Sequence, residues 1–152
     1  MATVSEILAK KGNQVETIGP EATAYDAARR MTERKIGCLV VTEGDKVCGI
    51  VSERDVLQKL VAEKRSAEQT PVRDIMTAQV RCCRADTSVD EIRYVMMDRR
   101  IRHLPVIDEG EKLVGIVSIG DANAMDAHSK EQTIHLMQEY IYGHTLQAPV
   151  TG

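Results

Sequence analysis

A seven-residue pattern occurs twice in the chain and constrains its fold more than any other feature. Gly-Ile-Val-Ser-Glu-Arg-Asp occupies residues 49–55, and Gly-Ile-Val-Ser-Ile-Gly-Asp occupies residues 115–121. One copy of so short a pattern could arise by chance. Two copies in matching surroundings indicate an internal duplication, with a chemical reason for the shared Ser and Asp.

The duplication extends well beyond this pattern. Residues 23–41 align with residues 88–106 without a gap, at an offset of 65 residues. One additional residue in the second copy changes the offset to 66 and lies in a glycine-containing turn, where insertions cost least. The duplicated segments cover about residues 4–56 and 72–122 of the 152-residue chain.

Both copies predict the same order of elements, β-α-β-β-α. A short extended segment leads to a Thr or Ser cap, which opens a helix with apolar residues at helical spacing. Two apolar strands joined by a glycine-containing turn follow, and Ser-x-x-Asp opens a second helix. The predicted elements are extended segments at 14–18 and 79–83, helices from 24 and from 89, strands at 38–42, 47–52, 103–108 and 113–118, and helices at 53–64 and 119–128.

This order predicts an α/β (α+β) fold. A unit of about 55 residues buries little apolar surface by itself, so the two repeats are expected to pack face to face with pseudo-twofold symmetry. We predict a first repeat at 1–64, a linker at 65–71, a second repeat at 72–127, and a C-terminal helix and tail at 128–152. The helix in the last segment is predicted from the apolar stripe Ile134, Leu136, Met137, Tyr140 and Ile141, and Gly143 ends it.

Composition argues against nucleic-acid and membrane partners. The net charge is −3, there is no basic run, and the only aromatic residues are four Tyr, so neither binding to a nucleic-acid backbone nor base stacking is indicated. No apolar run approaches the length of about 20 residues that a membrane span needs. The N-terminal sequence is mixed and charged, unlike a secretory signal. A cytoplasmic location is therefore expected.

No metal site and no catalytic residues are predicted. The four cysteines stand at positions 38, 48, 82 and 83 and do not form the paired Cys-x-x-Cys spacing of structural zinc sites. The sequence lacks Gly-x-Ser-x-Gly, the P-loop and His-Glu-x-x-His, so no enzyme class is supported.

The Ser-x-x-Asp pattern has two interpretations. At the end of a strand and the start of a helix, Ser and the free backbone N–H groups suit an anion such as phosphate. A carboxylate one turn later suits a vicinal diol, as in folds where an acidic residue binds a ribose. A nucleoside phosphate fits both. The simpler interpretation is that Ser52 and Ser118 are helix N-caps, with Asp55 and Asp121 in the first turn, which favours acidic residues.

The repeated element order, the segment Arg-Arg-Ile-Arg-His-Leu-Pro-Val-Ile-Asp at 99–108 and the closing Ser-x-x-Asp pattern together resemble a tandem pair of cystathionine β-synthase (CBS) domains, the Bateman module. Tyr-Ile-Tyr-Gly at 140–143 is similar to the C-terminal helix of small stand-alone bacterial members. The resemblance implies a regulatory homodimer rather than an enzyme. It also implies adenine-nucleotide ligands, namely AMP, ADP or ATP and sometimes NAD(H) or S-adenosylmethionine, together with an unidentified regulated protein as partner.

The resemblance also implies roles for individual residues in two composite clefts. The Asp121 cleft would include residues near 12–15 and Ile18, and the Asp55 cleft would include Met76, Thr77, Val80 and Cys82. The ribose would be bound by Asp55 and Asp121, the phosphates by Ser52, Arg54, Ser118, Arg102 and His103, and the adenine by Val15, Ile18, Ile36, Thr77, Val80, Cys82, Ile101 and Pro105.

The two copies differ in their basic residues. Arg102 and His103 of the second copy correspond to Gly37 and Cys38 of the first, where Arg54 could compensate. One tighter and one weaker nucleotide site are therefore expected, in an order that the sequence leaves open. Two alternatives also stay open: a non-catalytic scaffold with empty clefts, and an NAD(H)-linked redox sensor that would use the free cysteines.

Overall fold

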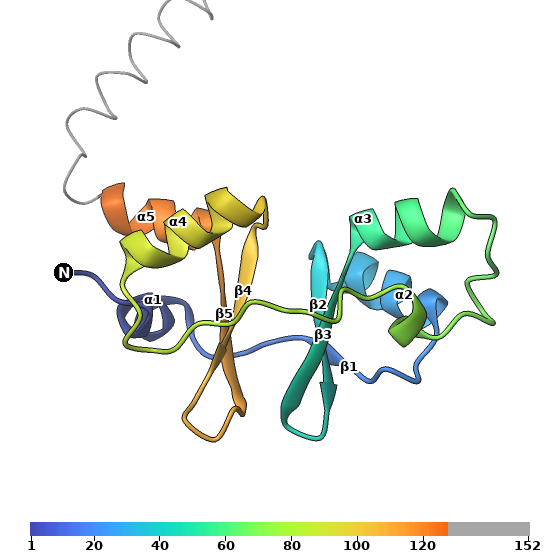
Figure 1. Ribbon diagram of the computed structural model, residues 1–152, viewed down its shortest axis with the longest axis horizontal. Coiled ribbons are helices and arrows are strands. Elements are labelled where there is room, and N and C mark those ends of the chain that lie inside the picture. The colour runs from blue at the N-terminus through green and yellow to red at the C-terminus, as the bar shows by residue number, and fades with distance from the viewer. Residues whose placement is uncertain (128–152) are drawn as a thin grey trace, which may run out of the picture.

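The computed structural model describes residues 1–127 and has two similar halves, each built around one β-hairpin (Figure 1). The first repeat contains β1 (Thr17–Ile18), α2 (Ala24–Arg34), β2 (Cys38–Glu43), β3 (Lys46–Ser52), α3 (Glu53–Asp55) and the π-helix η1 (Val56–Val61). The second contains α4 (Val89–Arg99), β4 (His103–Ile107), β5 (Leu113–Ser118) and α5 (Ile119–Ala127). Two further helices, α1 (Val4–Lys11) and the 3-10 helix η2 (Val72–Asp74), precede the repeats. The predicted α/β fold with two β-α-β-β-α repeats is confirmed.

The two hairpins lie side by side, with their turns on one side of the molecule and the helices that follow β3 and β5 on the other (Figure 1). In the first sheet β1 runs parallel to β2, and β2 is antiparallel to β3. In the second sheet β4 is antiparallel to β5. The turns contact each other directly, because Leu113 N donates to Asp45 O at 2.9 Å and Lys46 Nζ donates to Gly110 O at 3.1 Å.

The second sheet has no strand equivalent to β1 among the residues that the structure describes. In the first repeat Val40 N donates to Glu16 O at 3.2 Å. The equivalent position in the second repeat is Pro105, which has no N–H to donate. The segment predicted to be extended at 79–83 therefore pairs with β4 only through the isolated bridge between Cys83 and Val106.

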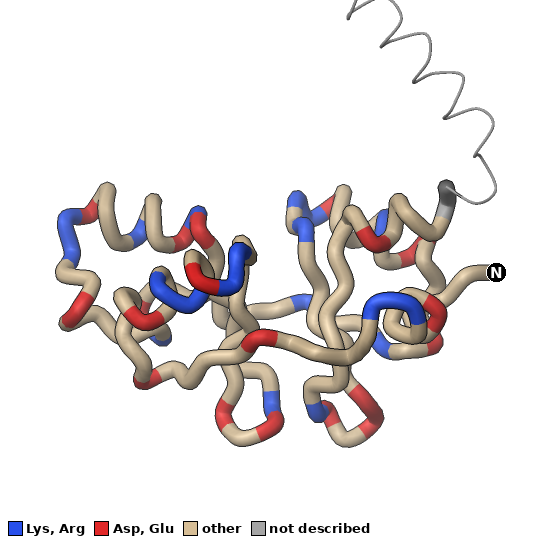
Figure 2. Tube along the Cα trace, turned by 180° about the vertical axis from the view of Figure 1, so that it is seen from behind, with Lys and Arg blue, Asp and Glu red and all other residues tan. Residues whose placement is uncertain are grey.

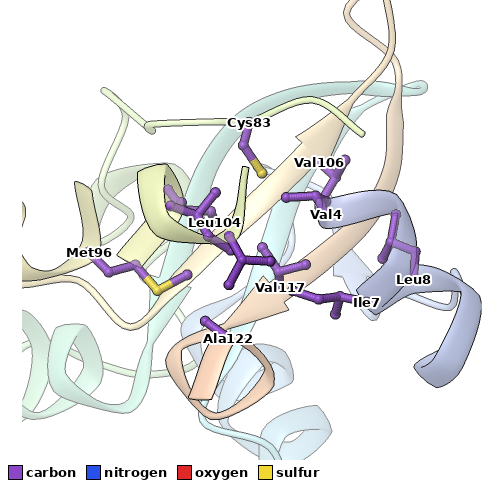
Figure 3. Packing of buried hydrophobic residues seen from close by; sticks show 11 residues of the cluster. Val4, Ile7, Leu8, Cys83, Met96, Leu104, Val106, Val117 and Ala122 are labelled. Carbon is purple, nitrogen blue, oxygen red and sulfur yellow. The ribbon is translucent and has the colours of Figure 1, made fainter. Parts of the chain in front are cut away.

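Each hairpin packs against a helix from outside its own repeat. Val4, Ile7 and Leu8 of α1 are buried in the second core, next to Val106 and Val117 (Figure 3). In return, the segment of η2 supplies the buried Val72 and Ile75 to the first core. We call residues 4–11 and 72–76 the crossing segments. The segment before the first repeat therefore completes the second core, and the segment between the two repeats completes the first core.

This crossing explains why glycine stands in both copies of the repeated pattern. Gly49 lies opposite Val41, and Gly115 lies opposite Val106. A Cβ at Gly49 would lie 2.5 Å from Met76 Sδ, and one at Gly115 would lie 2.8 Å from Leu8 Cδ2. Any larger residue at these strand positions would force Met76 or Leu8 of the crossing segments to shift, and glycine lets them approach this closely.

The helix predicted at 53–64 begins as expected but then widens. After α3, residues 56–61 form a π-helix whose end is marked by Ala62 N donating to Leu57 O at 3.0 Å. Short π-helical turns often lie at functional sites. The C-terminal helix and tail predicted at 128–152 lie outside the described residues, and the predicted domain boundaries remain predictions.

Candidate functional site

The first candidate site is the point where β3 ends and α3 begins, here called the Asp55 junction. Ser52 N donates to Asp55 Oδ2 at 2.9 Å, and Ser52 Oγ donates to the same oxygen at 3.1 Å. Asp55 N lies 3.2 Å from Ser52 Oγ and donates to it. These bonds form a capping box that fixes both side chains at the start of the helix.

The second candidate site, the Asp121 junction, repeats this geometry where β5 ends and α5 begins. Ser118 N donates to Asp121 Oδ2 at 2.8 Å, and Asp121 N donates to Ser118 Oγ at 3.1 Å. The same local sequence therefore gives the same hydrogen bonds in both repeats.

These bonds confirm the interpretation of the two Ser-x-x-Asp patterns as helix caps. Capping alone does not mark a binding site, because Thr23 and Asp26 make the same reciprocal pair of bonds at the start of α2. Other features must distinguish the two junctions from an ordinary helix start.

One such feature is a lysine on each carboxylate. At the Asp121 junction, Lys11 Nζ of α1 donates to Asp121 Oδ2 at 2.7 Å and to Ile116 O at 3.0 Å. At the Asp55 junction, Lys59 Nζ lies 3.0 Å from Asp55 Oδ1 and donates to Ile75 O at 3.2 Å. In both cases the ammonium joins the carboxylate to a crossing segment: Lys11 lies in one and also reaches β5, whereas Lys59 lies in η1 and reaches Ile75 of the other.

The two lysines were not singled out in the sequence. Lys11 and Asp121 are 110 residues apart, so no local pattern relates them. Lys59 stands four residues after Asp55 on one helical face, which is the usual spacing of helical ion pairs, and this signal could have identified it.

Lys11 also changes the acidity of Asp121. Burial by itself raises the pKa of this carboxyl group, but the hydrogen bonds from Lys11 and Ser118, together with the Lys11 charge, outweigh burial and lower the pKa below its ordinary value. The group is ionised at neutral pH and keeps its capacity to accept hydrogen bonds.

The structure brings Arg102 and His103 to the Asp121 junction. Ile119 N, at the start of α5, donates to Arg102 O at 2.9 Å. His103 is the residue directly opposite Ser118 in the antiparallel ladder. Burial lowers the pKa of His103, and the charges of Arg102 and Lys11 lower it further.

The corresponding residues of the Asp55 junction have a different charge. Glu53 N donates to Gly37 O at 3.0 Å, so Gly37 takes the place of Arg102. Cys38 lies opposite Ser52, where the second repeat has His103. Burial raises the pKa of the Cys38 thiol to about 11, with a further contribution from the Glu53 carboxylate. Arg54, which follows Glu53 in α3, is exposed.

Three of the residues predicted to line the adenine sites, Ile18, Thr77 and Pro105, lie in or pair with strands of the two sheets. Ile18 is buried in the first core, and Thr77 exchanges two hydrogen bonds with Ile50 of β3. Pro105 is buried in β4, where its carbonyl accepts from Cys83 N at 2.9 Å. The half-buried residues of the set are Val15, Ile36, Val80, Cys82 and Ile101.

Backbone pairing does not test the expected division between the two clefts. Thr77, assigned to the Asp55 cleft, pairs with Ile50 of the first hairpin. Ile18, assigned to the Asp121 cleft, lies in β1, which also pairs with the first hairpin, and Cys83, next to Cys82, bridges to the second hairpin. Contact of any of these residues with a ligand remains a prediction.

Metal and membrane chemistry find no support in residues 1–127. This part of the chain contains no group of three or more His, Cys, Asp or Glu side chains that could hold a metal ion. It also contains no helix that is long and apolar enough to cross a membrane. Figure 2 shows Lys and Arg interspersed with Asp and Glu along the trace.

Fold and sites define a duplicated α/β module with one Ser-x-x-Asp junction in each half. A family model of the CBS domain matches residues 4–62 and 72–123, so the chain belongs to the CBS-domain family. The protein called CBS domain-containing protein CBSX3, mitochondrial, from Arabidopsis thaliana is 35% identical over 151 residues, an alignment that covers 93% of this chain and 72% of that protein.

Solved structures agree with this assignment. A protein with CBS domains from Burkholderia ambifaria is 44% identical, with a TM-score of 0.76, and the match covers 80% of this chain and 90% of that one. A CBS domain protein from Pyrobaculum aerophilum, solved in complex with AMP, is 25% identical with a TM-score of 0.71, and the match covers 78% of this chain and 88% of that one.

Proposed function

We propose that this protein is a non-catalytic regulatory module that binds adenine nucleotides at the Asp55 and Asp121 junctions. Asp55 and Asp121 accept hydrogen bonds from the ribose, and Ser52, Arg54, Ser118, Arg102 and His103 contact the phosphates. AMP is the first ligand to test, because a relative of the same fold was solved with it. ADP, ATP, NAD(H) and S-adenosylmethionine complete the panel.

The observation that carries this proposal is the recurrence of one junction in two equivalent places. Each junction combines a carboxylate held by a cap with a lysine that reaches it from a different turn or element. A helix start needs only the cap, as Thr23 and Asp26 illustrate. The additional cation at both junctions supports a second role for the two carboxylates.

The test is a calorimetric titration of the full chain with the five ligands, repeated on Asp55→Asn and Asp121→Asn. Asn keeps an oxygen that can accept the cap bond but removes the charge, so loss of charge-assisted bonds to the ribose should weaken binding about tenfold or more. Asp26→Asn is the matched control, because it changes an equivalent cap outside both junctions. Binding that survives both junction variants would contradict the proposal.

A regulatory module needs two states and a partner that distinguishes them. We therefore include in the proposal a homodimer whose association or shape changes with the ligand, and an unidentified regulated protein. A cytoplasmic location is part of the same proposal, although the Arabidopsis relative is named as mitochondrial.

The rival function is a scaffold without ligand. If none of the five ligands produces heat or a thermal shift, the duplicated pattern would be reduced to a pair of helix caps, and the scaffold would be favoured.

A further inference from the structure

We propose that Lys11 is a ligand-binding residue of the Asp121 junction, and that its ammonium makes this junction, rather than the Asp55 junction, select an anionic ligand, a nucleoside 5′-phosphate. This inference rests on the proposed function, since it takes Asp121 as the residue that holds the ribose. It also predicts that the Asp121 junction binds AMP more tightly than the Asp55 junction, an order that the sequence leaves open.

The first step of the argument is the number of donors on Lys11. A lysine ammonium has three N–H donors. Two of them are used, by Asp121 Oδ2 and by Ile116 O. None of the described residues accepts the third, and 33% of the Lys11 side chain is exposed. The ammonium is therefore fixed in position and still has one donor for a ligand.

The second step concerns Asp121 itself. Its Oδ2 accepts from Ser118 N and from Lys11 Nζ. Among the described residues none donates to Oδ1. A ribose diol can bind this oxygen while Lys11 stays on the other one, so the ligand and Lys11 are neighbours rather than competitors.

The third step is the charge around the junction. Lys11 offsets the charge of Asp121, and Arg102 adds a further cation at the start of α5. The Lys11 charge also reaches His103, where it contributes to the lowered pKa. The junction thus has a positive charge in excess while His103 is neutral, and this favours a ligand that carries phosphate.

The Asp55 junction matches the first step, because Lys59 also has two partners and a side chain that is 39% exposed, but it differs at the second and third steps. Both oxygens of Asp55 are engaged, Oδ2 by Ser52 and Oδ1 by Lys59. Gly37 and Cys38 replace the basic pair, and Glu53 lies close to Gly37, with its Oε1 3.6 Å from the position of a Cβ there. Arg54 and Lys59 balance Glu53 and Asp55, and the Lys11 charge reaches Cys38 only as the smallest of the effects on its pKa. Lys11 makes no contact with Asp55 among the described residues, so this junction has less positive charge with which to prefer an anion.

The experiment compares AMP with adenosine, which lacks the phosphate. Both are titrated into the full-length wild type, Lys11→Gln, Lys11→Arg, Lys59→Gln and the control Lys10→Gln, which changes an exposed neighbour on the same helix. Lys11→Gln should lower AMP affinity about tenfold or more and leave adenosine affinity within about threefold. Lys11→Arg should keep the preference for AMP, while Lys59→Gln and Lys10→Gln should change it little. Circular dichroism and thermal melts check that each variant is folded.

Several results would overturn the inference. If Lys11→Gln weakens AMP and adenosine equally, Lys11 only positions Asp121. If it strengthens both, Lys11 only competes with the ribose. An AMP preference that Lys11→Gln leaves unchanged, or that Lys59→Gln reduces as much, also contradicts the assignment. If the wild type binds none of the five ligands, the proposed function fails and the inference falls with it, a result distinct from the other outcomes.

Discussion

Single residues in this chain serve packing and chemistry at the same backbone positions. In the repeated pattern, glycine admits the crossing segment, Val51 and Val117 are fully buried, and the serines cap helices. The pattern is therefore duplicated for structural reasons that hold whether or not a ligand binds. Ligand binding would be an additional use of a carboxylate that the cap already fixes.

The close approach at Gly115 gives a prediction about stability. Gly115→Ala would place its Cβ 2.8 Å from Leu8 Cδ2, and the resulting shift of α1 or of the Leu8 side chain should cost about 1–3 kcal/mol of the free energy of unfolding. Urea denaturation measures this. The double variant Leu8→Val, Gly115→Ala should lose less than the sum of the two single changes, since the shorter side chain relieves the clash.

Gly19→Ala is the control for this experiment, because a Cβ at Gly19 has no atom within 4 Å. Strictly additive effects of the Leu8 and Gly115 changes would contradict the predicted contact.

His103 gives a prediction about pH. Its pKa is lowered in the folded protein by burial and by Arg102 and Lys11, whereas an unfolded histidine has a pKa of about 6.5. The unfolded chain therefore binds more protons just below that pH, and the free energy of unfolding falls as the pH falls through this window. His103→Gln should reduce the loss of thermal stability between pH 7.5 and pH 5.5.

Proton NMR checks the same point directly. The histidine signal that disappears in His103→Gln should titrate below pH 6.5. A signal that titrates above this value, or an unchanged pH dependence of the melting temperature, would show that the surroundings of His103 do not oppose its protonation.

At the scale of elements, the sequence predicted well what is local and repeated. The order β-α-β-β-α follows from apolar periodicity and caps, and the strands β2, β3, β4 and β5 lie within a residue or two of their predicted ranges. Features that depend on long-range contact were not predictable in this way. Lys11 reaches Asp121 across 110 residues, and no periodicity indicates such a pair.

Two departures from the predicted elements have identifiable causes. Pro105 removes a ladder donor, so the equivalent of β1 is reduced to a bridge. This could have been inferred from the alignment of Pro105 with Val40. The π-helix at 56–61 has no comparable signal in the sequence, and the structure offers no physical reason for it.

The crossing segments predict that a change before one repeat destabilises the other. Ile7 of α1 is 3% exposed and belongs to the second core, so Ile7→Ala should cost about 2–5 kcal/mol. Hydrogen exchange should then show lost protection in β4 and β5 before β2 and β3. The matched variant Val72→Ala should have the opposite effect, because Val72 is buried in the first core.

Equal loss of protection in both hairpins for both variants would contradict this assignment. It would indicate that the two cores unfold as one unit, so that the crossing segments do not define separate cores.

For the whole molecule, the side that carries the helices is the surface to examine for association. Leu57 and Val61 lie one turn apart on η1, and Tyr94 and Met97 lie one turn apart on α4; each leaves more than 60% of its surface exposed. Both helices lie on the side opposite the hairpin turns (Figure 1). Exposed apolar residues gathered on one side of a molecule favour association.

We therefore expect the proposed homodimer to use this side. In analytical ultracentrifugation the wild type should sediment as a dimer, and the double variant Leu57→Glu, Val61→Glu should shift toward the monomer, because two charges would be buried without partners. The control Gln14→Glu, Gln79→Glu adds the same charges at exposed positions away from these helices and should remain dimeric. A monomeric wild type would remove the homodimer from the proposal, and a dimer that persists in the Leu57, Val61 variant would place the interface elsewhere.

Because α3 and η1 carry both Asp55 and the apolar pair, a dimer through this side would also couple association to ligand binding. The dissociation constant of the wild-type dimer should therefore change when AMP is added.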